Sequence, residues 1–120
     1  MNTHSQKIYD TIVVGAGISG LSAAYHLKKF SPQAEFLVLE GRDNFGGTWD
    51  FFKYPGIRSD SDMHTLGFSF KPWNSRKFIA DGPAIMNYLD EAIEENNLKD
   101  LIKFNMHIES ASWNSIDSLW

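Results

Sequence analysis

The stretch TIVVGAGISGLSAAYHLKKFSPQAEFLVLE, residues 11–40, decides the fold that we expect. It begins with a β-branched apolar run at 11–14, which predicts a strand, and continues into the glycine-rich sequence GAGISG at 15–20. Apolar residues then recur at helical spacing until Ser31 and Pro32, which end the predicted helix. A second apolar run at 35–40 predicts another strand. Two short strands joined by a helix predict a βαβ unit with a parallel strand pair.

The glycines of this unit match G-x-G-x-x-G, directly after a strand and at the start of a helix. Gly15 would allow a tight turn, and Gly17 would let the backbone approach a pyrophosphate at the helix N-terminus. Gly20 would remove a side chain where the helix crosses the strand. Glu40, twenty residues later, would accept hydrogen bonds from a ribose, and its charge disfavours the 2′-phosphate of NADP. The predicted dinucleotide-binding residues here are Gly15, Ala16, Gly17, Ile18, Ser19, Gly20 and Glu40.

This half-motif does not by itself separate FAD from NAD. Composition argues against several other classes of partner and site. The 120 residues carry a net charge of -4, which disfavours nucleic acid and anionic membrane surfaces as partners. Without cysteine, the chain has no disulfide, no thiolate metal site and no cysteine nucleophile. The N-terminal sequence MNTHSQKIYD is polar, and the apolar run after it is too short for a signal h-region or a spanning helix, so we expect a cytoplasmic location by default.

Residues 46–73, GGTWDFFKYPGIRSDSDMHTLGFSFKPW, follow neither strand nor helix periodicity. Loops longer than about 12 to 15 residues usually bind something or are disordered, and the aromatic content argues against disorder. We therefore expect this loop to pack against a partner. Trp49 is interpreted either as a wall of the binding site or as core. The alternation of Asp60, Asp62 and His64 is a weak metal pattern, and no metal site is predicted. Four phenylalanines are expected in the core: Phe51, Phe52, Phe68 and Phe70.

The remainder of the chain predicts one more helix and one more strand. Asp81 is expected to cap a helix that begins at Gly82 and Pro83. Its buried stripe would be Ile85, Leu89, Ala92 and Ile93. Residues 102–108, IKFNMHI, alternate as in a strand, with Ile102, Phe104, Met106 and Ile108 on one face. Residues 114–118, NSIDS, predict a turn.

The sequences VVGAGISGLSAAYHL and LEGRDNFGGTWDFFKYPGIRSDSDMHTLGFSFKPW resemble the N-terminal FAD segment of the class B flavoprotein monooxygenases. The resemblance is strongest to the Baeyer-Villiger monooxygenases, and within them to the ethionamide-activating subgroup. It extends from about Tyr9 to Trp120. It implies an α/β, Rossmann-like βαβ FAD-binding domain, of which residues 1–120 are the N-terminal part with an incomplete sheet. The partner of the aromatic loop would then be FAD.

The resemblance also implies roles for individual residues. Gly46, Gly47, Thr48 and Trp49 resemble the segment that wraps FAD near its ribityl chain and ring. Asp60 resembles the aspartate beside the isoalloxazine, and Arg58 to Asp60 resemble the stretch that also approaches the nicotinamide cofactor. Ile108 resembles the residue whose main chain touches the adenine. No catalytic acid, base or nucleophile can be named from this chain.

The reaction implied by the resemblance is the NADPH- and O₂-dependent oxygenation of a small-molecule ketone or sulfur-containing substrate. The chain has no second glycine fingerprint for NADPH, no family histidine fingerprint and no later arginine of the kind that stabilises a peroxyflavin in the family. The NADPH site would therefore lie largely outside it. We therefore expect this chain to be the FAD-binding portion, a fragment, of such an enzyme. By itself, the 120-residue chain is expected to be inactive. Two alternatives stay open: part of another two-dinucleotide flavoprotein, such as an amine oxidase or a disulfide reductase, or a non-catalytic nucleotide-fold interaction module. The missing CxxxxC argues against the reductase.

Overall fold

A computed structural model describes residues 6–120 of the chain, so the first half of the polar N-terminal sequence lies outside the described residues. The predicted βαβ unit is confirmed. It consists of β1 (Thr11–Val14), α1 (Ile18–Phe30) and β2 (Phe36–Leu39). The two strands are parallel, in a register that runs from Thr11 opposite Phe36 to Val14 opposite Leu39. Gly15 and Glu40 therefore emerge at the same edge of the sheet, at the carboxyl ends of neighbouring strands.

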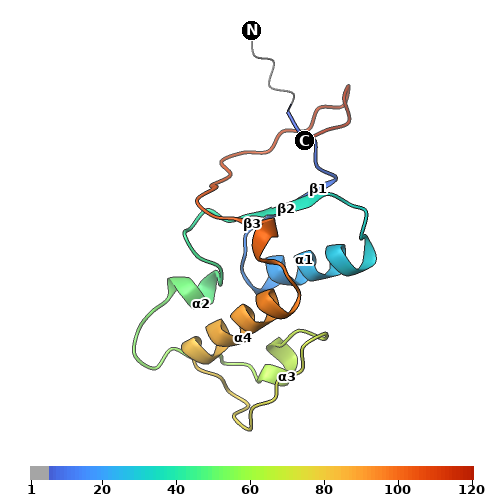
Figure 1. Cartoon of the computed structure of the whole chain (residues 1–120). Helices are drawn as coiled ribbons and strands as arrows, with labels where there is room; N and C mark the ends of the chain where they lie inside the picture. The colour runs from blue at the N-terminus through green and yellow to red at the C-terminus, as the bar shows by residue number, and fades with distance from the viewer. Residues whose placement is uncertain (1–5) are drawn as a thin grey trace.

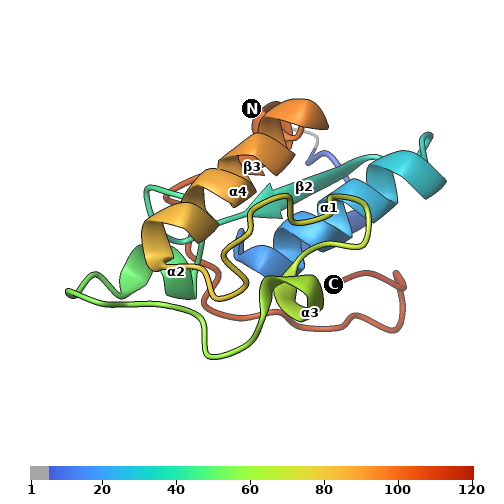
Figure 2. The same ribbon diagram turned by 90° about the horizontal axis from the view of Figure 1, so that it is seen from below.

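The second half of the fold adds α4 (Gly82–Glu95), a short 3₁₀ helix η1 (Lys99–Leu101) and β3 (Ile102–Lys103). β3 pairs in parallel with β2, which gives the strand order β1-β2-β3. Figure 1 shows α1 and α4 below the same face of this sheet. In the view from below, the two helices lie side by side, and they are in contact (Figure 2). The described residues therefore form two layers, with the core between the sheet and the two helices.

The core follows the predicted periodicities. The four residues predicted for the stripe of α4 are all buried, and so are Leu21 and Ala24 of α1. The predicted cap is also present, because an Asp81 side-chain oxygen accepts a hydrogen bond from the Ala84 amide at 2.8 Å. The cap begins α4 just after residue 81, where Pro83 suits the first turn.

The strand predicted for residues 102–108 is wrong in length, because only Ile102 and Lys103 belong to it. Asn105 has a positive φ of 57°, which turns the chain out of the strand direction. The amides of Asn105 and Met106 then bond to the Arg42 and Glu40 carbonyls, at 2.9 Å each, beyond the end of β2. Met106, expected on the buried face, is consequently exposed. Alternation alone did not reveal this turn.

The aromatic loop also differs from its prediction, since it contains two single-turn helices, α2 (Thr48–Phe51) and α3 (Met63–Leu66). Phe68 is buried, and the half-buried Phe70 stacks on it at 4.7 Å between ring centroids. Phe51 and Phe52 are not in the core, because they are 60% and 48% exposed. A single helical turn can bury only one side, and in α2 that side carries Trp49 and Asp50. The core prediction is therefore confirmed for two phenylalanines and wrong for the other two.

The turn predicted at 114–118 is confirmed. The Asn114 and Leu119 backbones bridge it in antiparallel fashion, with N–O distances of 2.7 and 3.2 Å. The Asn114 side-chain oxygen accepts from the Ile116 and Asp117 amides inside the turn. Across residues 6–120, no helix has the length and apolar character that crossing a membrane requires.

Candidate dinucleotide-binding cleft

The glycine turn between β1 and α1 has the geometry that its sequence predicts. Gly15 has a φ of 98°, a value that side-chain-bearing residues rarely adopt. A Cβ placed on Gly20 would lie 1.9 Å from the Gly15 carbonyl oxygen, which is far inside contact distance. Gly20 therefore allows α1 to begin directly against the end of β1.

Glu40 is held at this turn by the backbone. Its side chain is almost fully buried, at 7% residue exposure. One carboxylate oxygen accepts from the Ala16 amide at 2.8 Å, and the other accepts from the Arg42 amide at 2.9 Å. Because a carboxylate oxygen can accept more than one hydrogen bond, both oxygens retain capacity for a hydroxyl donor. The carboxylate is thus oriented beside the glycine turn before any ligand arrives.

A second glycine turn faces the first. The Gly46 amide donates to the Ala16 carbonyl at 2.8 Å, and both Gly46 and Gly47 have positive φ values, 115° and 55°. A Cβ on Gly17 would lie 3.7 Å from the Gly47 Cα, so side chains at these positions would enter the gap between the turns. The gap is a cleft of about 270 Å³. Its lining residues are Val14, Gly15, Gly17, Ile18, Ser19, Gly20, Gly46, Gly47, Thr48 and Trp49.

The N-terminus of α1 opens into this cleft. Gly17 caps the helix without a side chain, and Leu21 makes the first intrahelical bond, to the Gly17 carbonyl at 3.0 Å. The amides of Ile18, Ser19 and Gly20 precede that bond and so have no acceptor within the helix. Free amides and the positive end of the helix dipole favour an anion. Together with the two side-chain-free turns, these amides fit the pyrophosphate of a dinucleotide.

Trp49 joins the cleft to a larger hollow of about 620 Å³. The indole is half-buried and lines both spaces, so it is neither fully core nor fully exposed. The larger hollow is mainly apolar, and it lies between the aromatic loop and the first turn of α4. Besides Trp49, its apolar lining residues are Phe52, Tyr54, Pro55, Ile57, Pro83 and Met86. This shape and lining suit a flat, largely apolar ring system.

Five predicted site residues do not line the glycine cleft. Ala16 and Glu40 are hydrogen-bonded to each other at the glycine turn itself, whereas Arg58, Asp60 and Ile108 lie elsewhere. Arg58 borders a separate hollow of about 600 Å³ with Lys77 and Asp81, and Asp60 is exposed. Ile108 is half-buried and follows His107, whose Nδ1 would lie 3.1 Å from a Cβ on Gly41. The segment before Ile108 therefore passes the end of β2, close to Glu40. The roles of Arg58, Asp60 and Ile108 remain predictions.

Asp62, one of the alternating acids of the aromatic loop, has a structural task. The Asp62 carboxylate accepts from the Thr65 amide and hydroxyl, at 3.0 Å each, and so caps α3. Hydrogen bonding from Thr65 is the main reason that the pKa of Asp62 lies below its usual value. Among residues 6–120, no group of three or more His, Cys, Asp or Glu side chains is placed to hold a metal ion.

Sequence reasoning missed a charged cluster beside the cleft. Asp50 is only 3% exposed, and its carboxylate accepts from Arg42 Nη2 and Asn44 Nδ2, at 2.9 Å each. Burial acts to raise the pKa of Asp50, but the hydrogen bonds from Arg42 and Asn44 and the charges of Lys53 and Arg42 outweigh it. The resulting pKa lies below the usual value. The available signal was a cation two residues after Glu40 and an acid directly after Trp49.

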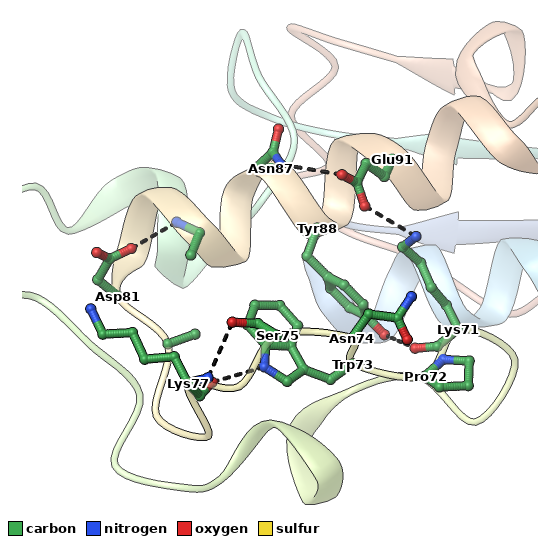
Figure 3. A pocket seen from close by; sticks show the side chains of 12 residues that line it. Lys71, Pro72, Trp73, Asn74, Ser75, Lys77, Asp81, Asn87, Tyr88 and Glu91 are labelled. Carbon is green, nitrogen blue, oxygen red and sulfur yellow. Dashed lines mark hydrogen bonds and ion pairs between the residues drawn. The ribbon is translucent and has the colours of Figure 1, made fainter.

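A further pocket of about 290 Å³ lies away from the glycine cleft, between α4 and the loop at 71–77 (Figure 3). At one end, the Tyr88 hydroxyl donates to the Lys71 carbonyl at 2.5 Å and accepts from the Phe68 amide at 2.8 Å. Lys71 Nζ pairs with Glu91 and Glu95, at 3.1 and 2.9 Å. Burial acts to lower the pKa of Lys71, but the two glutamates raise it overall. These contacts hold the loop at 71–77 against α4, so we assign Tyr88 and Lys71 a structural role.

The chain is similar to known proteins over most of its length. Residues 13–92 match the family described as NAD(P)-binding Rossmann-like domain. The chain is 54% identical over 112 residues to the FAD-containing monooxygenase EthA of Mycolicibacterium smegmatis, and 52% identical over 115 residues to a probable FAD-binding monooxygenase, AlmA, of an Acinetobacter species. These matches cover 93% and 96% of the chain, but only 23% of either relative.

Solved structures of similar proteins give the same picture. Cyclohexanone monooxygenase from Rhodococcus sp. Phi1, bound to NADP+, matches 97% of this chain and 23% of its own length, with a TM-score of 0.85 and 27% identity. An oxidized steroid monooxygenase bound to NADP matches 90% of the chain and 21% of its own length, with a TM-score of 0.82 and 32% identity. The described fold thus corresponds to under a quarter of each of these proteins.

Proposed function

The chain belongs to the family of NAD(P)-binding Rossmann-like domains and corresponds to the N-terminal FAD-binding part of class B flavin monooxygenases, and from this we propose that it binds FAD within an NADPH- and O₂-dependent monooxygenase. The observation that carries the proposal is the facing pair of glycine turns. Glu40, which directly follows β2, is held beside them by a hydrogen bond from the Ala16 amide. A bound flavin would supply the redox chemistry. The chain itself binds and orients the cofactor.

The division of labour follows the positions of the residues. The amides at the start of α1 bind the pyrophosphate, and Glu40 accepts hydrogen bonds from the ribose hydroxyls of the adenosine half. Gly46 and Gly47 let the second turn approach the ribityl chain, and Trp49 forms a wall for the ring. FAD is favoured over NAD because the cleft continues past Trp49 into an apolar hollow of about 620 Å³, large enough for a flat tricyclic ring.

NADPH and the oxygenated substrate belong to the whole protein. Arg58 borders a hollow that shares Gly56 and Asp81 with the apolar one. On the resemblance to the monooxygenases, we assign Arg58 and Asp60 to the region that NADPH approaches. The substrate class that we propose, a ketone or a sulfur-containing small molecule, rests on the similarity to the monooxygenases alone. A crystal structure of a cyclohexanone monooxygenase with bound cyclohexanone, 27% identical to this chain, supports the ketone class.

The test of the cofactor assignment is an FAD titration of the purified 120-residue chain, followed by flavin fluorescence and by co-elution through a desalting column. We expect saturable binding that Gly17→Val and Glu40→Ala both weaken. The valine would fill the gap beside Gly47, and the alanine would remove the ribose acceptor. Glu94→Ala is the matched control, because Glu94 is exposed on α4, away from the cleft. If the folded chain does not bind FAD, the result would instead favour the alternative of a non-catalytic interaction module.

A further inference from the structure

We propose that Asp50 is a positioning residue for FAD, which acts by holding the Gly46–Trp49 turn against the glycine turn of α1. This inference rests on the proposed function, since it concerns the same cleft. Asp50 itself does not line the cleft. It follows Trp49 in α2, and its amide bonds to the Gly47 carbonyl at 3.1 Å. The direction in which the Asp50 side chain is held therefore sets the orientation of both Gly47 and Trp49.

The hydrogen-bond donors to the Asp50 carboxylate come from the segment shortly after Glu40, and Lys53 adds an ion pair at 3.6 Å. Arg42 Nη2 and Asn44 Nδ2 donate to separate oxygens of the carboxylate, at 2.9 Å each. The Arg42 amide donates in turn to the second Glu40 oxygen, and the first Glu40 oxygen accepts from Ala16. A continuous chain of hydrogen bonds thus connects the α1 glycine turn, the predicted ribose acceptor and the helix that carries Trp49. We call Arg42, Asn44 and Asp50 the α2 clamp.

The Arg42 guanidinium contacts both the Asp50 carboxylate and the Phe51 ring. The guanidinium carbon lies 5.0 Å from the centre of the Phe51 ring, so an exposed aromatic covers the ion pair. Arg42 Nε is buried and has no hydrogen-bond partner within the described structure. The contacts that hold the guanidinium are therefore those to Asp50 and Phe51, and none is made at Nε. This also explains the exposure of Phe51, which shields the clamp instead of entering the core.

A buried carboxylate in a one-turn helix is costly unless it is fully hydrogen-bonded, and α2 is too short to be stable alone. The clamp meets both needs. It satisfies Asp50, and it fastens α2 to the segment after β2. When the Asp50 charge is removed, Arg42 loses its ionic partner and the side chain keeps one acceptor oxygen for two donors, so the turn that carries Gly47 and Trp49 loses its fixed orientation. Binding of FAD would then have to order this turn, at the expense of affinity.

The test compares FAD binding by the wild-type chain, Asp50→Asn, Arg42→Gln and the double variant. We expect the dissociation constant to rise about tenfold in each single variant, with little further rise in the double variant, because both remove the same contact. The second readout is the flavin emission of the saturated complex. It should increase in Asp50→Asn, since Trp49 would no longer lie steadily against the ring and quench it. A purely structural role would lower the folded fraction but leave this emission unchanged.

The control is Glu35→Gln, which removes a carboxylate from the exposed ion pair with Lys7, 3.5 Å long and remote from the cleft. Its FAD affinity should equal that of the wild type. If Asp50→Asn fails to fold, Asn44→Ala removes one donor without leaving a buried charge unpaired, and it should weaken binding about threefold.

The outcomes separate this inference from the proposed function. A folded wild-type chain that does not bind FAD overturns both. A wild-type chain that binds FAD, with unchanged affinity and emission in the folded clamp variants, overturns the clamp alone. Additive effects of Arg42→Gln and Asp50→Asn would also overturn it, because the two side chains would then act independently.

Discussion

The glycines of the α1 turn differ in how strictly the backbone requires them, although the motif lists them as equivalent. Gly20 is required for the backbone path, because its missing Cβ would collide with the Gly15 carbonyl at 1.9 Å. Gly17 has a φ of -78°, and a Cβ there would meet Gly47 at an ordinary 3.7 Å. We expect Gly20→Ala to lower the free energy of unfolding by about 3 kcal/mol and Gly17→Ala by less than about 1 kcal/mol. Chemical denaturation measures both, and equal losses would contradict this assignment.

Asp50 makes stability depend on acid pH. Its pKa in the folded chain lies below its ordinary value of 3.8, so the folded state releases this proton more readily than the unfolded state. The contribution of Asp50 is therefore complete well above pH 3.8 and is lost as the pH falls below 3.8 through the folded-state value. We expect Asp50→Asn to cost about 2 kcal/mol at neutral pH. The difference from wild type should shrink towards pH 3, and a constant difference would exclude this cause.

At the scale of elements, the stability of α4 depends on its N-cap residue, Asp81. The Asp81 side chain satisfies the Ala84 amide, which otherwise has no partner within the helix. Asp81→Ala should destabilise the chain by about 1 kcal/mol, as loss of an N-cap typically does. Asp90→Ala is the control, since it removes the same side chain from an exposed position inside the same helix. Thermal unfolding of the two variants, side by side, checks the prediction; similar midpoints would show that the cap contributes little.

The loop at 68–77 depends on one hydroxyl of α4. Tyr88 bonds both the buried Phe68 amide and the Lys71 carbonyl, as Figure 3 shows for the latter. Tyr88→Phe would leave the Phe68 amide buried without an acceptor, at a cost of about 2 kcal/mol. Faster proteolysis within 68–77 should accompany the loss. Tyr54→Phe is the control, because Tyr54 is largely exposed, and it should change neither quantity. Unchanged cleavage in Tyr88→Phe would refute the anchoring role.

At the scale of the whole molecule, one layer of helices covers one face of a three-stranded sheet. Within residues 6–120, β1 pairs only with β2, and Val14, at its end, is 68% exposed beside the cleft. The cleft lies where β1, β2 and the aromatic loop meet, so a ligand bound there would connect all three. Binding and folding should therefore be thermodynamically linked.

We expect FAD at one hundred times its dissociation constant to stabilise the chain by about 2.7 kcal/mol. Differential scanning fluorimetry with increasing FAD should show a rising midpoint in the wild type and a reduced rise in Gly17→Val. FMN, which lacks the adenosine half, serves as the ligand control and should have a weaker effect. An equal shift by FMN would mean that Glu40 and the α1 turn do not contribute to binding.

Local patterns were sufficient for the βαβ unit, the glycine turn, the Asp81 cap and the apolar stripe of α4. Each depends on residues close together in the chain, where strand and helix periods, missing side chains and capping groups act directly. The same holds for the family resemblance, because each of its motifs, GGTW and YPGIRSDSD, is an uninterrupted run of residues. The sequence by itself therefore determined the fold class and the position of the candidate cleft.

Only the tertiary structure decided the α2 clamp, the exposure of Phe51 and Phe52, the early end of β3 and the facing of Gly17 and Gly47. Each of these depends on contacts between segments that no periodicity connects. Asp50 is buried because Arg42 and Asn44 satisfy it, and β3 ends because Asn105 turns the chain. Whether a charge is buried or an aromatic exposed is set by the partners that folding brings to it, and local sequence does not contain those partners.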